Sequence, residues 1–377
     1  MYTDLRSRAL VSPAFGARAP GKTHVKASVV DIAVRDPVYK PTPTSDAWGR
    51  IAEHFICDRR DLPFLKLMAI QSATVIPTGV VLFLPHGFSW WLAGLHVALV
   101  VYFLGPFVLM LHNTSHRRLF RQPWGWMNRY IPWVLGPFFG ESPEAYFAHH
   151  VGMHHPENNL DDDLSTTLPY RRDSIVDFSR YFFHFLFFAL FELAEYFGAR
   201  KRRALFWRTV VGELSFYSLA IALLFVSWRA DLVVFIVPLV VTRFAMMAGN
   251  WAQHAFVDEA SPENNYRNSI TCINCVYNRR CFNDGYHIGH HLKATRHWTE
   301  LPEEFARNVA TYAKEGAIVF AGIDFFGVWC CLMLQRYEWL AARLVELGET
   351  QKSPEEVMSL LRNRTAWTRP RSSAMAA

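Results

Sequence analysis

Histidine is the residue type whose placement in this sequence points most directly to chemistry. Ten of the sixteen histidines lie in or beside three short segments, whereas histidines that only pack would be scattered. They are His112 and His116; His149, His150, His154 and His155; and His254, His287, His290 and His291. A neutral imidazole is a good ligand for a first-row transition metal. The sequence therefore predicts a metal site, and one that holds more than one ion.

Two pairs of histidines have the i, i+4 spacing that places side chains on one face of a helix. They are His112 with His116, and His150 with His154. Each pair can chelate an ion from its own helix. His155 points about 100° away from His154 on an ideal helix, so we expect it to reach a second ion.

The third segment repeats this doubling. His287, His290 and His291 have i, i+3 and i+4 spacing, so on a helix they could converge on one point, and His290–His291 is again an adjacent pair. Four ligands saturate a tetrahedral zinc ion, so this many imidazoles favours two ions in one cavity. Nitrogen-rich ligation with open positions favours two iron ions and O2 chemistry.

The carboxylates are expected to hydrogen-bond to the ligand histidines and not to bind the metal ions themselves. The sequence has no Glu-x-x-His pair of the kind that soluble di-iron bundles use, so imidazole must dominate the site. We expect Asp284, or the run Asp161 to Asp163, to orient ligand histidines through hydrogen bonds, although a solvated acidic turn would also explain that run. His149 could bind a metal ion itself or hydrogen-bond to a ligand.

The rest of the sequence is that of a membrane protein. The chain of 377 residues is 51% hydrophobic and only 19% charged. Apolar runs near the roughly 20 residues that cross a bilayer occur at 67–85, 91–111, 211–228 and 231–248. The net charge of +6 falls mainly in loops, where an anionic membrane surface explains it, and no nucleic-acid-binding fold is evident. We expect an all-α, polytopic membrane protein with about four transmembrane helices.

The arginines predict which side of the membrane carries the site. Several arginines follow the run 91–111, so the positive-inside rule puts its histidine end, together with the amino terminus, on the cytoplasmic side. A basic cluster at 200–203 follows the Phe-rich run 181–197, which we expect to lie in the membrane interface because crossing would translocate that cluster. All histidine segments then share a cytoplasmic, histidine-rich helical cap. The membrane would be the inner membrane of a bacterium or the endoplasmic reticulum of a eukaryote.

The domain boundaries follow from composition. Residues 1–45 are polar and basic, which predicts a flexible tail or a transit peptide. Residues 46–348 form one expected domain, and 349–377 a second basic tail. The apolar run 316–334 contains an aspartate, so we expect it to pack over the site or on the bilayer surface, with a further span as the alternative.

Taken together, these segments resemble the histidine boxes of the membrane fatty acid desaturase and hydroxylase superfamily. The matching motifs are His112-x-x-x-His116, His150-x-x-x-His154-His155, Asn250-x-x-x-His254 and His287-x-x-His290-His291, within roughly residues 67–300. The resemblance implies a di-iron centre bound by these histidines, with Asn250 holding a metal-bound water. It also implies that O2 activated there abstracts hydrogen from an unactivated C–H bond of a lipid or acyl chain. Electrons would come from a separate cytochrome b5 or ferredoxin, because the sequence has neither a His-Pro-Gly-Gly haem motif nor a Gly-rich dinucleotide fingerprint.

Several alternatives stay open at this stage. The second box is one residue longer than the common His-x-x-His-His, which keeps a lipid or isoprenoid hydroxylase or ketolase of the same superfamily in view. Paired histidines could instead hold haem in an electron carrier, although single opposed ligands would suffice for that. A zinc-dependent membrane hydrolase is a third alternative. Cys272, Cys275 and Cys281 could bind zinc, but a second pair at zinc-finger spacing is missing.

Overall fold

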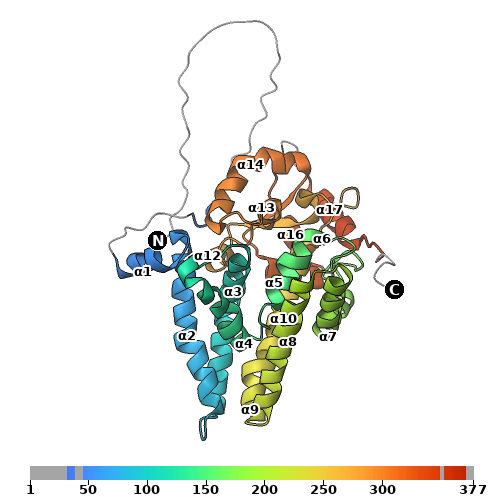
Figure 1. Ribbon diagram of the computed structural model, residues 1–377. Coiled ribbons are helices and arrows are strands. Elements are labelled where there is room, and N and C mark those ends of the chain that lie inside the picture. Colours follow the sequence, from blue (N-terminus) through green and yellow to red (C-terminus); the bar gives the residue numbers. More distant parts are fainter. Residues whose placement is uncertain (1–31, 39–45, 349–351, 371–377) are drawn as a thin grey trace, which may run out of the picture.

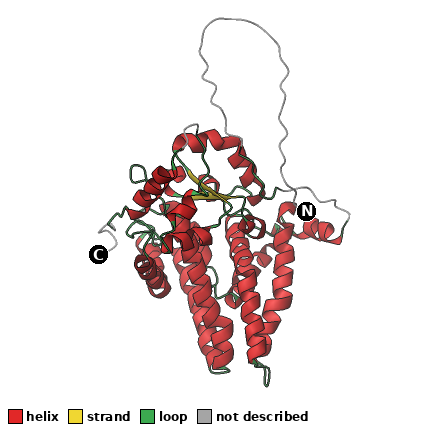
Figure 2. Cartoon of the chain, turned by 180° about the vertical axis from the view of Figure 1, so that it is seen from behind, coloured by secondary structure: helices red, strands yellow, loops and turns green. Residues whose placement is uncertain are grey.

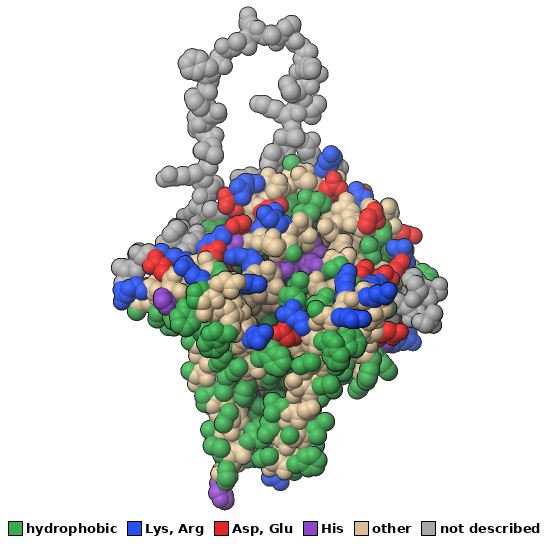
Figure 3. Space-filling view, in the orientation of Figure 1, with side chains coloured by type: hydrophobic (Ala, Val, Ile, Leu, Met, Phe, Trp, Pro, Cys, Tyr) green, Lys and Arg blue, Asp and Glu red, His purple; other side chains and the backbone are tan. Residues whose placement is uncertain are grey.

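The computed structural model describes residues 32–38, 46–348 and 352–370. These residues form a narrow stem of long helices and a broad end of short elements above it (Figure 1). The stem is coated with hydrophobic side chains, whereas charged side chains gather on the broad end (Figure 3). This separation is the one expected of a protein whose stem lies in a bilayer.

The stem consists of helices that run side by side. Its elements are α2 (Leu62–Phe83), α3 (Trp90–His116), α8 (Arg203–Leu224), α9 (Trp228–Asp231), the π-helical turn η5 (Leu232–Ile236) and α10 (Val237–Gln253). The last three form one continuous helical stretch, Trp228–Gln253, which ends directly before His254. Large apolar side chains such as Tyr102, Leu214 and Ile221 face outward from the stem and are more than half exposed.

Five helices of the described chain are long and apolar enough to cross a membrane, one more than the four predicted spans. The additional helix is α7 (Ile175–Ala199). It lies beside the broad end and does not reach the far tip of the stem, where α2, α3, α8 and α9 end (Figures 1 and 2). The length and composition of α7 would also allow a crossing, so its place in the membrane interface stays a prediction.

The broad end is built from short helices, helical turns and two strands. Before α8 these are α1 (Ala47–Phe55), η1 (Arg59–Asp61), η2 (Gln122–Arg129), η3 (Ile131–Leu135), α4 (Gly136–Phe138), α5 (Ala145–His149), η4 (His150–His154) and α6 (His155–Glu157). After α10 they are α11 (Asn265–Asn268), β1 (Ile270–Ile273), α12 (Val276–Arg280), α13 (His287–Leu292), η6 (Trp298–Glu300), α14 (Leu301–Glu315), β2 (Ile318–Ala321), α15 (Phe325–Met333), α16 (Tyr337–Ala341) and α17 (Pro354–Ala366). Strands β1 and β2 pair in parallel, with Ile270 opposite Ile318 (Figure 2, yellow). The expected all-α fold therefore needs this small sheet added to it.

The run 316–334 divides between two elements. Strand β2 takes its first part and the nine-residue helix α15 its second, so the alternative of a further span is wrong. Helix α15 begins after Asp324, whose carboxylate accepts a hydrogen bond from the Gly327 N–H as an N-cap. It packs against α10 and reaches the histidine region, since the rings of Phe325 and His287 lie 6.0 Å apart.

The expected tails are partly folded. In the C-terminal segment, helix α17 begins with a capping box at Ser353 and Glu356 and buries Val357 and Leu361 in the core, so the prediction of a frayed tail is wrong there. In the N-terminal segment, residues 32–38 lie against the broad end, with Val34 and Asp36 buried. The remainder of both predicted tails, residues 1–31, 39–45, 349–351 and 371–377, lies outside the described residues.

Candidate metal centre

Nine histidines converge in two adjacent groups. The first group consists of His112, His116, His150, His155 and His290, and the second group of His154, His254, His287 and His291. Within each group, one ring nitrogen of every histidine lies within 4.8 Å of those of the others. No other type of potential ligand belongs to either group. All nine histidines that the sequence singled out as ligands are thus brought together.

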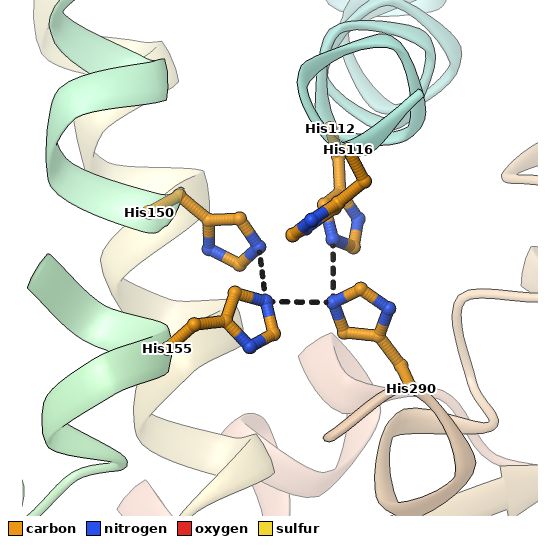
Figure 4. Close-up of side chains that lie close together, drawn as sticks. All are labelled: His112, His116, His150, His155 and His290. Atoms are coloured by element: carbon orange, nitrogen blue, oxygen red, sulfur yellow. Dashed lines mark hydrogen bonds between the residues drawn. The ribbon is translucent and has the colours of Figure 1, made fainter. Parts of the chain in front are cut away.

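The first group joins side chains from three parts of the chain (Figure 4). The Nε2 atom of His290 lies 2.9 Å from that of His112 and 2.9 Å from that of His155, and His155 and His150 approach to 3.1 Å through the same atoms. In the second group, the Nε2 atom of His287 lies 3.0 Å from that of His291 and 3.4 Å from that of His254. The rings therefore point their Nε2 atoms at common points.

These distances fit a metal ion between the rings. Two imidazole nitrogens that bind one ion at about 2.0–2.1 Å, at right angles or in a tetrahedral arrangement, lie roughly 2.8–3.4 Å apart. Neutral imidazoles at this separation have no strong reason to converge by themselves. The residues of both groups thus fit metal ions, and two buried donor atoms, Nε2 of His116 and Nδ1 of His287, have no hydrogen-bond partner among the described residues.

The two groups lie side by side because adjacent histidines diverge. His154 belongs to the second group and His155 to the first, and the same division separates His291 from His290. The rings of His155 and His291 are 5.0 Å apart across the two groups. The predicted divergence of neighbouring histidines toward two ions therefore agrees with the geometry, whereas the expected convergence of His287, His290 and His291 on one point is wrong.

A π-helical turn explains how the second segment divides its histidines. Turn η4 spans His150–His154, and the N–H of His155 donates to the carbonyl of His150, a bond from residue i+5 to residue i. In such a turn the chain wraps one residue more than in an α-helix. His150 and His155 consequently share the first group, and the expected pairing of His150 with His154 is wrong. The extra residue of this box is absorbed in the turn.

The surrounding elements hold this segment in place. Helix α8 passes close to the chain before α5 at Gly212, where a Cβ atom would lie 1.6 Å from the carbonyl oxygen of Pro143. Arg202, at the start of α8, donates to the carbonyl of Gly152 inside the π-helical turn. These contacts fix the register of the second segment against the stem.

Outer hydrogen bonds orient four of the histidine rings. The Nδ1 atom of His154 lies 2.7 Å from an oxygen of Asp163, and that of His112 lies 3.2 Å from an oxygen of Asp284. Two amide oxygens serve the second group, with Asn268 2.8 Å from Nδ1 of His254 and Asn158 2.9 Å from Nδ1 of His291. An acceptor at Nδ1 leaves the Nε2 lone pair free for a metal ion, which is the arrangement that outer residues impose on metal-binding histidines.

Burial keeps the imidazoles in the form that binds metal. It lowers the pKa of His254 to about 4 and that of His155 to about 2, and neighbouring histidines lower the pKa of His155 further. The pKa values of His287, His290 and His291 are also lowered well below the ordinary value by burial and by neighbouring histidines. At neutral pH these rings are therefore uncharged.

An apolar cavity of about 300 Å³ leads to both groups. Apolar side chains of α3, α10 and α15 form its walls, including Leu104, Met247 and Phe326, and histidines of both groups face it. Asn250 and Gln253 add polar atoms near the histidines. A cavity of this kind can hold a hydrocarbon chain against the candidate metal centre.

Of the aspartates predicted to orient a histidine, the structure places Asp284 and Asp163 against a ligand, but not Asp161. Asp284 contacts His112 as expected, with its second oxygen accepting from the Tyr277 hydroxyl. Asp161 does not orient a histidine, because it forms an ion pair with Arg369; Asp163 takes that place instead. The two residues are close in sequence, but only Asp163 is buried beneath the histidines.

Two further predicted residues lie beside the groups. His149 belongs to neither group, and its Nε2 atom has no hydrogen-bond partner among the described residues. Asn250 lines the cavity, and its Nδ2 atom donates to the Ser165 carbonyl and the Tyr181 hydroxyl. The cysteine zinc site has no support, since the candidate metal groups of the described chain contain no cysteine.

Sequence reasoning missed the amide partners Asn158 and Asn268, and within the run Asp161 to Asp163 it did not single out Asp163. Asn158 stands three residues after a box histidine, in a run of polar residues that gives a weak signal of a structured loop. Asn268 gives no signal, because it meets His254 only through the fold of the broad end.

Comparison with known proteins agrees with this geometry. A family model described as fatty acid desaturase matches residues 88–322, which is more than half of the chain. No curated protein and no solved structure matches the chain. The matched region contains both histidine groups and the helices that carry them. The chain therefore belongs to the fatty acid desaturase family.

Proposed function

We propose that the protein introduces a double bond into a lipid acyl chain, using O2, two iron ions and electrons from a separate carrier such as cytochrome b5 or a ferredoxin. The observation that carries the proposal is the position of the two histidine groups, side by side against an apolar cavity. Family membership supports an oxidoreductase that acts on lipid. The nitrogen-rich donor sets favour iron or a similar transition metal over magnesium or calcium.

Iron bound by the two groups would supply the O2 chemistry that removes hydrogen from an unactivated C–H bond. In the balanced reaction a CH2–CH2 unit loses two hydrogens, and O2 takes these with two electrons and two protons to give two waters. The electrons must arrive from outside, because no redox cofactor motif other than the histidine boxes is present in the sequence.

The residues of the chain position the substrate and control water. Apolar walls from Leu104, Met247 and Phe326 hold the acyl chain and keep bulk water from the histidines. Asn250 is suited to hold a water at the centre, since Ser165 and Tyr181 fix its Nδ2 atom and its Oδ1 atom makes no hydrogen bond with a described residue. We assign Asp163 and Asp284 the role of orienting His154 and His112.

We also propose the orientation in the membrane. The basic residues that follow α3 and α7 place the broad end on the cytoplasmic side, where a soluble electron carrier can reach it. Four stem helices would span the bilayer, while α7 would lie in the interface. The predicted division into one domain, 46–348, with flanking segments is part of this proposal.

A hydroxylase of the same superfamily was suggested mainly by the longer second box. The longer box is a weaker argument for a hydroxylase once the π-helical turn is seen, because the turn accommodates the extra residue while His150 and His155 still meet. We therefore favour desaturation.

Product analysis tests the proposal. The full chain would be expressed in a host of defined lipid composition, with a His290→Ala variant as the control, and the extracted lipids analysed by mass spectrometry. We expect an acyl chain about 2 Da lighter that is absent from the control. A chain about 16 Da heavier would move the assignment to a hydroxylase. Unchanged lipids from a protein that purifies with zinc would contradict the proposal and favour the hydrolase.

A further inference from the structure

A second cavity, of about 630 Å³, borders the first histidine group at His116. We call it the arginine chamber, because Arg117, Arg118, Arg129 and Arg208 line it. Its walls come mainly from the end of α3, from η2, from α5 and the segment that leads into it, and from Arg208 of α8, and polar side chains dominate them. The function proposed above, as far as it concerns the metal ions and the apolar cavity, makes no use of this chamber.

Two of the four arginines are already paired. Arg117 lies 3.2 Å from Asp58 and 3.4 Å from Asp61. Arg208 lies 2.6 Å from Glu144, the one carboxylate that lines the chamber, and stacks over the Phe147 ring. These contacts hold both guanidinium groups in place and neutralise most of their charge.

The other two arginines keep their charge available. Arg118 and Arg129 are exposed and form no ion pair within the described part of the chain. A positive charge excess inside a concave polar site attracts anions. A guanidinium group also presents a planar set of donors that matches a phosphate better than any other common anion except a carboxylate.

The surroundings suggest that the anion carries an apolar part. The chamber lies among segments that join the stem to the broad end, and two exposed tryptophans are sequence neighbours of its lining residues: Trp126 follows Gly125 and is 69% exposed, and Trp207 precedes Arg208 and is 59% exposed. Tryptophan at such a boundary is typical of the membrane interface. On the face drawn in Figure 3, basic side chains gather where the broad end meets the apolar stem.

One side chain connects the chamber with the apolar cavity. Tyr146 lines both, and its ring stacks on His150 of the first group at a centroid distance of 5.3 Å. To reach the apolar cavity, a molecule with its polar end in the arginine chamber would have to pass Tyr146 and the histidines. The first histidine group would then lie beside its hydrocarbon chain.

We propose that the arginine chamber binds the phosphate-bearing polar end of the acyl substrate, and that Arg118 and Arg129 are its main recognition residues. The inference rests on the proposed function, whose substrate class it narrows. The phosphate can belong to a phospholipid headgroup or to a soluble phosphate-bearing carrier of the acyl chain. A volume of about 630 Å³ accommodates a phosphate ester, which is larger than a bare carboxylate needs.

Ligand binding to the purified full chain in an uncharged detergent tests the inference. The probes are dioctanoyl phosphatidylglycerol, octanoyl-coenzyme A, octanoic acid and dioctanoylglycerol. We expect one of the two phosphate-bearing probes to bind more tightly than octanoic acid and dioctanoylglycerol, and its affinity to fall as salt is raised. Tighter binding of the phosphatidylglycerol identifies a phospholipid as the source of the phosphate, and tighter binding of the thioester identifies a soluble carrier.

Matched variants assign the binding to the chamber. The Arg118→Gln/Arg129→Gln double variant should weaken the preferred probe by roughly tenfold or more, because each guanidinium–phosphate contact is a charge-assisted hydrogen bond. Arg203→Gln/Lys314→Gln removes the same charge from exposed positions outside the chamber and should leave the affinity unchanged. Should the double variant fail to fold, Arg118→Lys replaces it; it keeps the charge but not the paired donors and should still weaken binding.

Equal affinity of the double variant and the unmodified protein would overturn the inference, as would equal binding of the phosphate-bearing and phosphate-free probes. The measurement needs neither O2 nor reductant. A protein that alters lipids but binds no phosphate would therefore refute the chamber alone, and one that binds phosphate without altering lipids would refute the proposed reaction alone.

Discussion

The two histidine groups differ in how the protein supports them. In the second group, three of four rings have an outer acceptor at Nδ1, supplied by Asp163, Asn268 and Asn158. In the first group, with five rings, Asp284 alone plays that part among the described residues, and it serves only His112. The second group is also more deeply buried, whereas the first borders the arginine chamber.

This difference indicates two kinds of site. Rings whose orientation is fixed before the metal arrives lose less freedom when they bind it, so the second group should hold its ion more tightly. Rings with fewer fixed contacts can adjust as ligands of the ion change. We infer that the first group is the more adaptable of the two and the second the more rigid.

The largest loss of activity and of bound metal should come from removing one histidine of either group. His155→Ala in the first group and His291→Ala in the second should each abolish product formation, because both ions are needed. Each variant should also lose about one of two bound ions, as measured by elemental analysis. Full activity of either variant would remove the corresponding group from the centre.

Replacing the carboxylates that hydrogen-bond to the ligand histidines should reduce metal affinity by a smaller amount, and the reduction should differ between the two groups. Asp163 accepts hydrogen bonds from the N–H groups of Asn159 and Ser165 and from the Ser165 hydroxyl, besides holding His154. Burial alone would raise its pKa, but His154 and these hydrogen bonds lower it below the ordinary value, so the carboxylate is ionised.

We expect Asp163→Asn to weaken metal binding by about 10- to 100-fold in competition with a chelator, and Asp284→Asn to weaken it less. Normal metal affinity in the Asp163→Asn variant would contradict the assignment of the rigid site to the second group. A larger loss of metal affinity in Asp284→Asn than in Asp163→Asn would contradict it as well.

The dependence of stability on pH should be shared by both groups. With its pKa lowered to about 4 by burial, His254 stays neutral in the folded protein below pH 6.5, while the unfolded chain takes up a proton. His155 behaves in the same way, with its pKa lowered to about 2. Since the unfolded state binds more protons, stability is fully present above about pH 6.5 and is lost as pH falls below that value.

For the metal-free protein, we expect Tm to drop by roughly 5 °C or more between pH 7.5 and pH 5. His254→Asn should reduce the drop, as followed by thermal unfolding in detergent. A Tm that rises on acidification would show that these rings are protonated in the fold.

The smallest effect should follow from shortening the second box. Deletion of Val151 would convert the π-helical turn to an α-helical one and leave His-x-x-His-His. We expect His154 and His155 still to diverge to separate groups, so that product formation falls by less than about tenfold. Loss of metal from both groups would mean that the π-helical turn itself is required.

Much of the site could be predicted because its signal is local. Close helical spacing identified eight of the nine histidines, the family resemblance added His254, and the divergence of His154 from His155 follows from the geometry of any helix. The long apolar runs predicted the stem, with helix ends displaced by up to eight residues, at the start of α8. These features depend on residues that are close in the sequence.

The errors concern features that depend on distant contacts or on a local departure from the α-helix. Spacing alone could not reveal the π-helical turn, so His150 was paired with His154 when it meets His155. Asp161 and Asp163 are equivalent in composition, and only packing against the histidines distinguishes them. Helix α17 resembled a basic tail because its apolar residues are few, although Leu361 is fully buried.

The di-iron centre is tested most directly by the metal content of the purified full chain, measured together with X-ray absorption at the iron edge. We expect about two iron ions per chain, each surrounded mainly by nitrogen ligands, and about one ion in the His291→Ala variant. A single ion per chain, or zinc in place of iron in an active preparation, would contradict it.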